Sequence, residues 1–126
     1  MRVTALHDAS ETGKILTVSS GSGPLRGVWR GKSPIHAGQT FDVELEIRRP
    51  RHWSDLIAAE GQQSISEGVA SVVRGCIVEV FEDRTVALQV GASIILLEMI
   101  DESPGESVGD PVILVADDLE FYPTEI

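Results

Sequence analysis

The sequence predicts an all-β fold with one short helix, arranged as a small antiparallel β-barrel or β-sandwich of eight to nine strands. Several short stretches alternate apolar and polar residues with the period of a half-buried strand, most clearly at 40–48 and 86–90. Glycine, proline and small polar residues separate these stretches at intervals typical of all-β domains. A helical signal is confined to one segment, at 54–61.

Length and composition predict a single β domain over residues 1–126. A chain of 126 residues with 42% hydrophobic residues is long enough to bury a core without covalent staples. No apolar run approaches the length of a membrane span. Because the sequence has one cysteine and no signal-peptide pattern, we expect a cytoplasmic protein without disulfides.

Three strands are expected early in the chain, at 2–8, 14–20 and 25–30, with the first at a sheet edge. The tripeptide that begins at Gly31 reads Gly-Lys-Ser and resembles the end of a phosphate-binding loop. Arg26 stands where that motif needs a glycine, so we interpret the segment as an ordinary connection.

The segment 40–48 gives the clearest strand signal. Its apolar positions are expected to face the core, and they are Phe41, Val43, Leu45 and Ile47. The intervening positions are expected to face solvent, and they are Asp42, Glu44, Glu46 and Arg48. Carboxylates in a row could suggest a metal site. However, a spacing of about 7 Å along one strand brings in no converging ligand, so we interpret them as a solvated face.

A short helix is predicted after the basic cluster at 48–52. Ser54 is a candidate N-cap, Asp55 lies in the first turn and Gly61 is a stop signal, which together predict about two helical turns. His52 and Asp55 could also form an acid–base pair. Capping and solvation are the simpler interpretation of these two side chains.

An antiparallel meander is the organising element of the chain. After a polar connector at 62–67, its strands are expected at 69–81, 85–91 and 92–99. Gly75 lies inside the first of these strands and predicts a bulge or sharp bend. Cys76 lies in the most apolar part, so we expect a buried and inert thiol.

The chain ends with alternating acidic loops and strands. An acidic loop at 100–107 leads to a strand at 111–116, and the acidic turn at 117–118 leads to a final strand at 119–122. The net charge of −10 is therefore uneven: residues 1–78 contribute about +1 and residues 79–126 contribute −11. A negative surface repels nucleic acid and anionic lipid and attracts cationic proteins. We therefore expect no nucleic-acid or membrane partner, although the charge could also serve solubility alone.

The charge distribution favours a non-enzymatic protein-binding module. We expect an acidic inhibitor of the immunity type, which occludes the active site of a basic protein partner, a toxin or nuclease domain. Binding residues tend to gather on loops. The candidate contacts are Asp101, Glu102, Glu106, Asp110, Asp117, Asp118 and Glu120.

Two other classes of function remain open. An accessory or small-ligand-binding β-domain of a larger assembly would use an apolar pocket or a strand edge, marked by Trp29 and Trp53. An enzyme would have to assemble its site from residues without a recognised spacing, which are His7, Asp8, His36, His52, Asp55 and Cys76. We therefore expect no catalytic residue, no metal and no cofactor.

Overall fold

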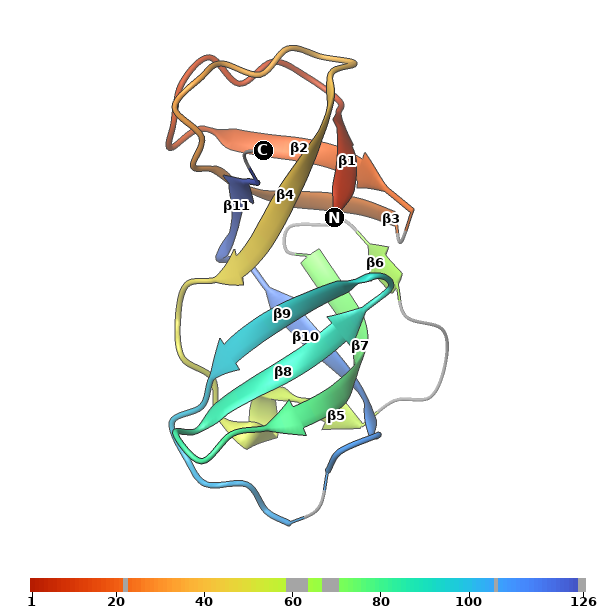
Figure 1. Cartoon of the computed structure of the whole chain (residues 1–126), viewed down its shortest axis with the longest axis vertical. Helices are drawn as coiled ribbons and strands as arrows, with labels where there is room; N and C mark the ends of the chain where they lie inside the picture. The colour runs from red at the N-terminus through yellow and green to blue at the C-terminus, as the bar shows by residue number, and fades with distance from the viewer. Residues whose placement is uncertain (22, 59–63, 67–70, 106, 125–126) are drawn as a thin grey trace.

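The computed structural model describes residues 1–126 except 22, 59–63, 67–70, 106 and 125–126. It confirms the predicted all-β class: the described residues form eleven strands and one short 3₁₀ turn. The strands form a closed barrel and a second antiparallel sheet, stacked along the long axis of the molecule (Figure 1). No helix in the described part of the chain has the length and apolar character needed to cross a membrane.

Five strands from both ends of the chain form the barrel. They are β1 (Arg2–Ala5), β2 (Ile15–Ser20), β3 (Gly23–Trp29), β4 (Thr40–Ile47) and β11 (Leu119–Pro123). Their order is β1-β2-β3-β11-β4, and β1 pairs with both β2 and β4, which closes the barrel. The expectation of an edge strand near the N-terminus is therefore wrong, because closure leaves β1 no free edge.

Six strands form the second sheet. They are β5 (Ile57–Ala58), β6 (Ser64–Ser66), β7 (Ser71–Val80), β8 (Thr85–Val90), β9 (Ser93–Glu98) and β10 (Pro111–Ala116). Five of them follow the order β5-β10-β7-β8-β9, and β6 pairs with β7. The predicted meander is confirmed as β7, β8 and β9. Residues 64–66 were expected to be a connector, but they pair with β7 and form a strand.

The segment 51–58 contacts the second sheet at two places. Arg51 forms a parallel bridge with Met99, just after β9. A few residues later, Ile57 pairs with Ile113 of β10. One short segment therefore contacts the chain just after the edge strand β9 and pairs, as β5, with β10 on the other side of the sheet. The buried core residues of this sheet include Ile77, Leu88 and Leu97.

The predicted helix at 54–61 is wrong. Only a 3₁₀ turn forms, at Trp53–Asp55, and Leu56 already has an extended backbone. The Asp55 carboxylate accepts the backbone N–H of His52 at 2.8 Å, so it caps the turn as expected from the sequence. Pairing of β-branched Ile57 with β10 then fixes the chain as a strand, because tertiary pairing outweighs local helical propensity. Residues 59–61 lie outside the described residues.

The predicted bulge is also displaced from Gly75. The register of β7 against β8 shifts between Ile77 and Glu79. A Cβ at Gly75 would lie 2.7 Å from the carbonyl oxygen of Gln89, so this glycine permits close strand approach without a bulge. The bulge itself leaves Val78 and Glu79 both exposed.

Candidate functional site

A groove lies between β4 of the barrel and β9 of the second sheet. Its volume is about 840 Å³. It is lined by Met1, Val43, Glu44, Leu45, Glu46, Ile47, Asp83, Thr85, Ala92, Ser93, Ile94, Leu96, Glu98 and Thr124. Four of the lining residues are acidic and none is lysine or arginine. We call this feature the acidic groove.

Strand alternation places the side chains on both walls of the acidic groove. On β4, Val43 and Leu45 are buried, so Glu44 and Glu46 point outward as the sequence predicted. On β9, Ile95 and Leu97 are buried, which leaves the outward positions to Ile94, Leu96 and Glu98.

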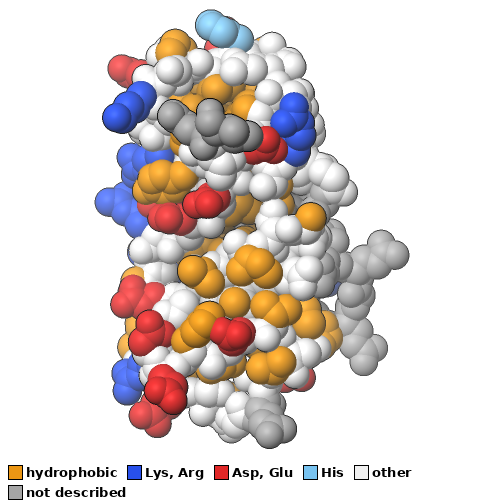
Figure 2. Space-filling view, in the orientation of Figure 1, with side chains coloured by type: hydrophobic (Ala, Val, Ile, Leu, Met, Phe, Trp, Pro, Cys, Tyr) orange, Lys and Arg blue, Asp and Glu red, His pale blue; other side chains and the backbone are white. Residues whose placement is uncertain are grey.

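Two aliphatic side chains on β9 are about half exposed. Ile94 is 49% exposed and Leu96 is 56% exposed. Figure 2 shows hydrophobic side chains gathered over β8 and β9 in the lower half of the molecule, with acidic side chains beside them. Such a patch beside unpaired charge is typical of a contact surface for another molecule.

The carboxylates of the acidic groove have no ion-pair partner among the described residues. Glu44, Glu46 and Glu98 are exposed, and none of the three forms a salt bridge there. Asp83 is equally exposed and accepts the backbone N–H of Thr85 at 3.1 Å, and it forms no salt bridge with another described residue. The groove therefore concentrates negative charge that no lysine or arginine in its lining neutralises.

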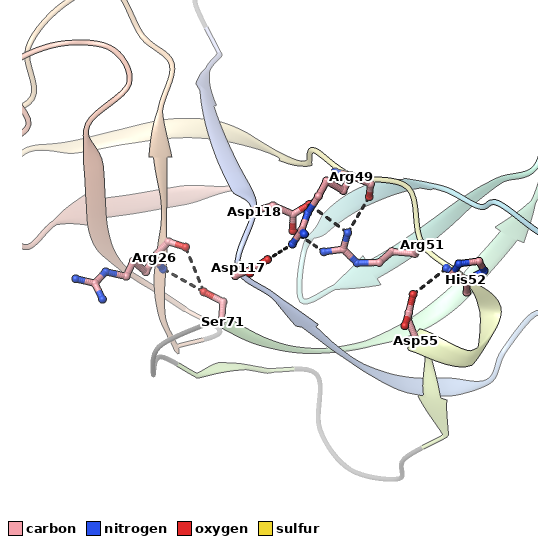
Figure 3. A network of polar contacts seen from close by, with 8 residues as sticks. All are labelled: Arg26, Arg49, Arg51, His52, Asp55, Ser71, Asp117 and Asp118. Atoms are coloured by element: carbon pink, nitrogen blue, oxygen red, sulfur yellow. Dashed lines mark hydrogen bonds and ion pairs between the residues drawn. The ribbon is translucent and has the colours of Figure 1, made fainter.

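A second group of charges lies where the chain crosses between barrel and sheet. Arg49 and Arg51 follow β4, while Asp117 and Asp118 connect β10 to β11. Figure 3 shows the two arginines pointing toward the two aspartates. We call these four residues the crossover cluster.

The crossover cluster is an ion-pair network centred on the Asp118 carboxylate. Arg51 donates through Nη1 to Asp118 Oδ2 at 3.1 Å, and through Nη2 to the other carboxylate oxygen. The backbone N–H of Arg49 donates to Asp118 Oδ2 at 2.7 Å, and the Arg49 side chain pairs with Asp117. The side chains of Arg51 and Asp118 are 9% and 8% exposed, so this pair is shielded from water.

The environment of Asp118 lowers the pKa of its carboxyl group below the ordinary value of 3.8. Burial alone would raise this pKa. Hydrogen bonds from the Arg51 side chain and the Arg49 backbone, together with the charges of both arginines, outweigh burial. The carboxylate is therefore held ionised as part of the fold.

The structure divides the acidic residues predicted as partner contacts. Asp101, Glu102 and Asp110 are exposed on loops of the second sheet, and Glu106 lies outside the described residues. Glu102 pairs with Arg84 at 3.6 Å, and Asp101 accepts the backbone N–H of Trp53 at 2.9 Å.

The remaining three predicted contacts belong to the crossing between the two halves. Asp117 is exposed but paired with Arg49. Asp118 is buried, and Glu120 lies in β11, not on a loop, with its side chain 8% exposed and paired with Arg30. Asp118 and Glu120 are therefore largely shielded from solvent and paired within the chain.

The possible catalytic residues lie apart from the acidic groove. His7 accepts the backbone N–H of Thr17 at 3.0 Å through Nε2, and Asp8 accepts that of Ala37 at 2.8 Å, so both support barrel loops. Cys76 is half-buried, not fully buried as expected. Within the described ranges, no group of three or more His, Cys, Asp or Glu is arranged to hold a metal ion.

Sequence reasoning did not select the residues of the acidic groove. It placed Glu44 and Glu46 on an outward face but interpreted that face as merely solvated. The missing information was that β9 lies opposite β4 with two apolar residues exposed. Comparison of the chain with family models, curated proteins and solved structures found no match.

Proposed function

We propose that this protein is a non-enzymatic binding module for a basic protein partner, and that the acidic groove is its contact surface. The main supporting observation is a groove with four carboxylates, no lysine or arginine in its lining and exposed aliphatic side chains on one wall. Contact with a cationic surface would satisfy the carboxylates and cover the apolar side chains in one event.

Electrostatics favours a basic protein over other partners. The chain has a net charge of −10, and the groove adds a local concentration of negative charge. Nucleic acid and anionic lipid would be repelled by such a surface. A cationic protein would be steered toward it, with an association rate that falls as salt rises.

The partner that we propose first is a basic toxin such as a nuclease domain. An immunity-type inhibitor of such a toxin would place carboxylates where the substrate phosphates bind and would occlude the active site. This proposal includes a cytoplasmic location, because the single cysteine is compatible with a reducing compartment.

The test compares three baits that are immobilised at low salt, with retained proteins eluted by salt and identified. The baits are the unchanged protein, a groove variant (Glu44→Gln, Glu46→Gln, Glu98→Gln) and a loop variant (Asp101→Asn, Glu102→Gln, Asp110→Asn). Both variants remove the same formal charge from different places. We expect a basic protein on the unchanged bait and on the loop variant, but not on the groove variant.

Two results would contradict this proposal. One is the absence of any basic protein released by salt. The other is equal retention by the groove variant. Retention lost only in the loop variant would move the contact surface to the acidic loops at 101–110. If the retained protein is a nuclease, the unchanged protein should inhibit it and the groove variant should not.

The alternative is an accessory β-domain of a larger assembly, which would bind through apolar surface. Exposed Ile57 and Val115, at 58% and 55%, are the observation in its favour, because they lie on the second sheet outside the acidic groove. This function predicts a partner that is retained at high salt and is lost when both side chains become serine.

A further inference from the structure

The two walls of the acidic groove carry matching rows of side chains. Ile94 and Leu96 are alternate residues of β9, so their Cα atoms are about 7 Å apart along the strand. Glu44 and Glu46 are alternate residues of β4 and have the same repeat. One wall therefore presents two apolar side chains and the other presents two carboxylates, at equal spacing.

The two strands also run in the same general direction. In Figure 1, β4 descends steeply and β9 runs at a shallower angle, both toward the lower left of the view. The four side chains of the two rows line the same groove. An extended segment has two rows of side chains that point to opposite sides and repeat at about the same 7 Å. A segment lying along the groove can face both rows at once.

Resting on the proposed function, we propose that the groove binds an extended segment of the basic partner in which lysine or arginine alternates with large apolar residues. The basic side chains pair with Glu44 and Glu46, while the apolar side chains cover Ile94 and Leu96. Asp83 and Glu98 extend the negative charge at one end of the groove.

Charge excludes a second copy of this chain as the occupant. A symmetric dimer through the groove would enclose the four carboxylates of each copy in one interface, with no lysine or arginine in either lining to pair with them. A helical occupant fits less well, because a helix places similar residues three or four positions apart on one face and turns the opposite face away. An extended segment with alternating residues can contact both walls, because its two rows of side chains point to opposite sides.

Synthetic peptides test this proposal directly. The first probe is a short, capped peptide that alternates lysine and leucine. Three further peptides serve as controls. In the lysine–serine peptide each leucine is replaced by serine. In the block peptide the same residues form one lysine block and one leucine block, and in the helix-spaced peptide the leucines stand three or four positions apart. We expect the alternating lysine–leucine peptide to bind the unchanged protein about tenfold more tightly than each of the others.

Paired variants locate the binding. Ile94→Ser with Leu96→Ser should reduce the affinity for the alternating lysine–leucine peptide to that of the lysine–serine peptide. Leu6→Ser with Ile15→Ser changes a leucine and an isoleucine of nearly the same exposure, 53% and 50%, outside the groove and should leave the affinity unchanged. All four side chains are about half exposed, so thermal unfolding of both variants should match that of the unchanged protein and exclude misfolding as the cause.

The possible failures are distinguishable. Equal, salt-sensitive binding of all four peptides would overturn the extended, alternating mode and leave the proposed function standing. Equal binding of the helix-spaced peptide alone would overturn the extended form of the occupant. If no peptide binds in a salt-sensitive way, the extended-segment inference fails, and the bait experiment alone decides the proposed function.

Discussion

The acidic groove and the crossover cluster contain the same kind of side chain in opposite situations. Asp118 in the crossover cluster is buried and neutralised by arginines of the same chain. Glu44 and Glu46 in the groove are exposed and have no ion-pair partner among the described residues. The comparison shows that the number of acidic residues in the sequence does not give the number of carboxylates that a partner can contact. That number also depends on how many carboxylates form ion pairs within the chain.

The largest expected effect comes from breaking the crossover cluster at its centre. Asp118→Asn leaves the buried guanidinium of Arg51 without its counterion and should lower the free energy of unfolding by about 3 kcal/mol. Glu46→Gln, as the matched change in the groove, should alter it by less than about 0.5 kcal/mol. Urea denaturation of both variants measures the two changes in the free energy of unfolding. Equal changes would contradict the difference that we expect between the crossover cluster and the acidic groove.

Replacing the whole buried pair sharpens the same comparison. Arg51→Met combined with Asp118→Leu removes both charges together, so no uncompensated charge remains. We expect the double variant to be more stable than Asp118→Asn by about 1–2 kcal/mol in urea denaturation. The Arg49 backbone N–H then loses its acceptor, so recovery should be incomplete. A double variant less stable than the single one would show that the pair itself is strongly stabilising.

Acid should selectively remove the contribution of the crossover cluster. The pKa of Asp118 is lowered in the folded protein, so its contribution to stability is fully present above the unfolded-state pKa near 3.8. That contribution is lost as the pH falls through 3.8 toward the folded-state pKa. The stability difference between the unchanged protein and Asp118→Asn should therefore be constant near neutral pH and shrink below about pH 4.5. Urea denaturation at a series of pH values measures it, and a constant difference down to pH 3 would contradict it.

The smallest expected effect is in the groove itself. Glu44→Gln with Glu46→Gln removes two like charges from one face and should raise stability by a few tenths of a kcal/mol at low ionic strength. The gain should disappear in about 0.5 M salt, because the exposed charges are then screened. Thermal unfolding at the two salt concentrations measures the gain. A loss of stability at low salt would show that these carboxylates have a structural role like that of Asp118.

Predictions from the sequence were correct where the evidence was local and periodic. The alternation along β4 and the three strands of the meander are confirmed. Both predictions depend on side-chain periodicity and turn residues, which neighbouring positions in the sequence show directly. The helix at 54–61 failed because pairing of Ile57 with β10 is a contact with a distant residue. The role of Asp118 was missed because Arg51, its partner, lies far away in the sequence.

The sequence by itself determined that this chain forms strands, which side chains of β4 face solvent, and that negative charge is in excess. Only the tertiary structure decided which carboxylates are free. It brought Arg51 to Asp118 and Arg30 to Glu120, and it set the exposed Ile94 and Leu96 of β9 opposite the carboxylates of β4. The physical reason is that strand formation depends on local side-chain pattern, whereas ion pairing and groove formation depend on which distant segments fold side by side.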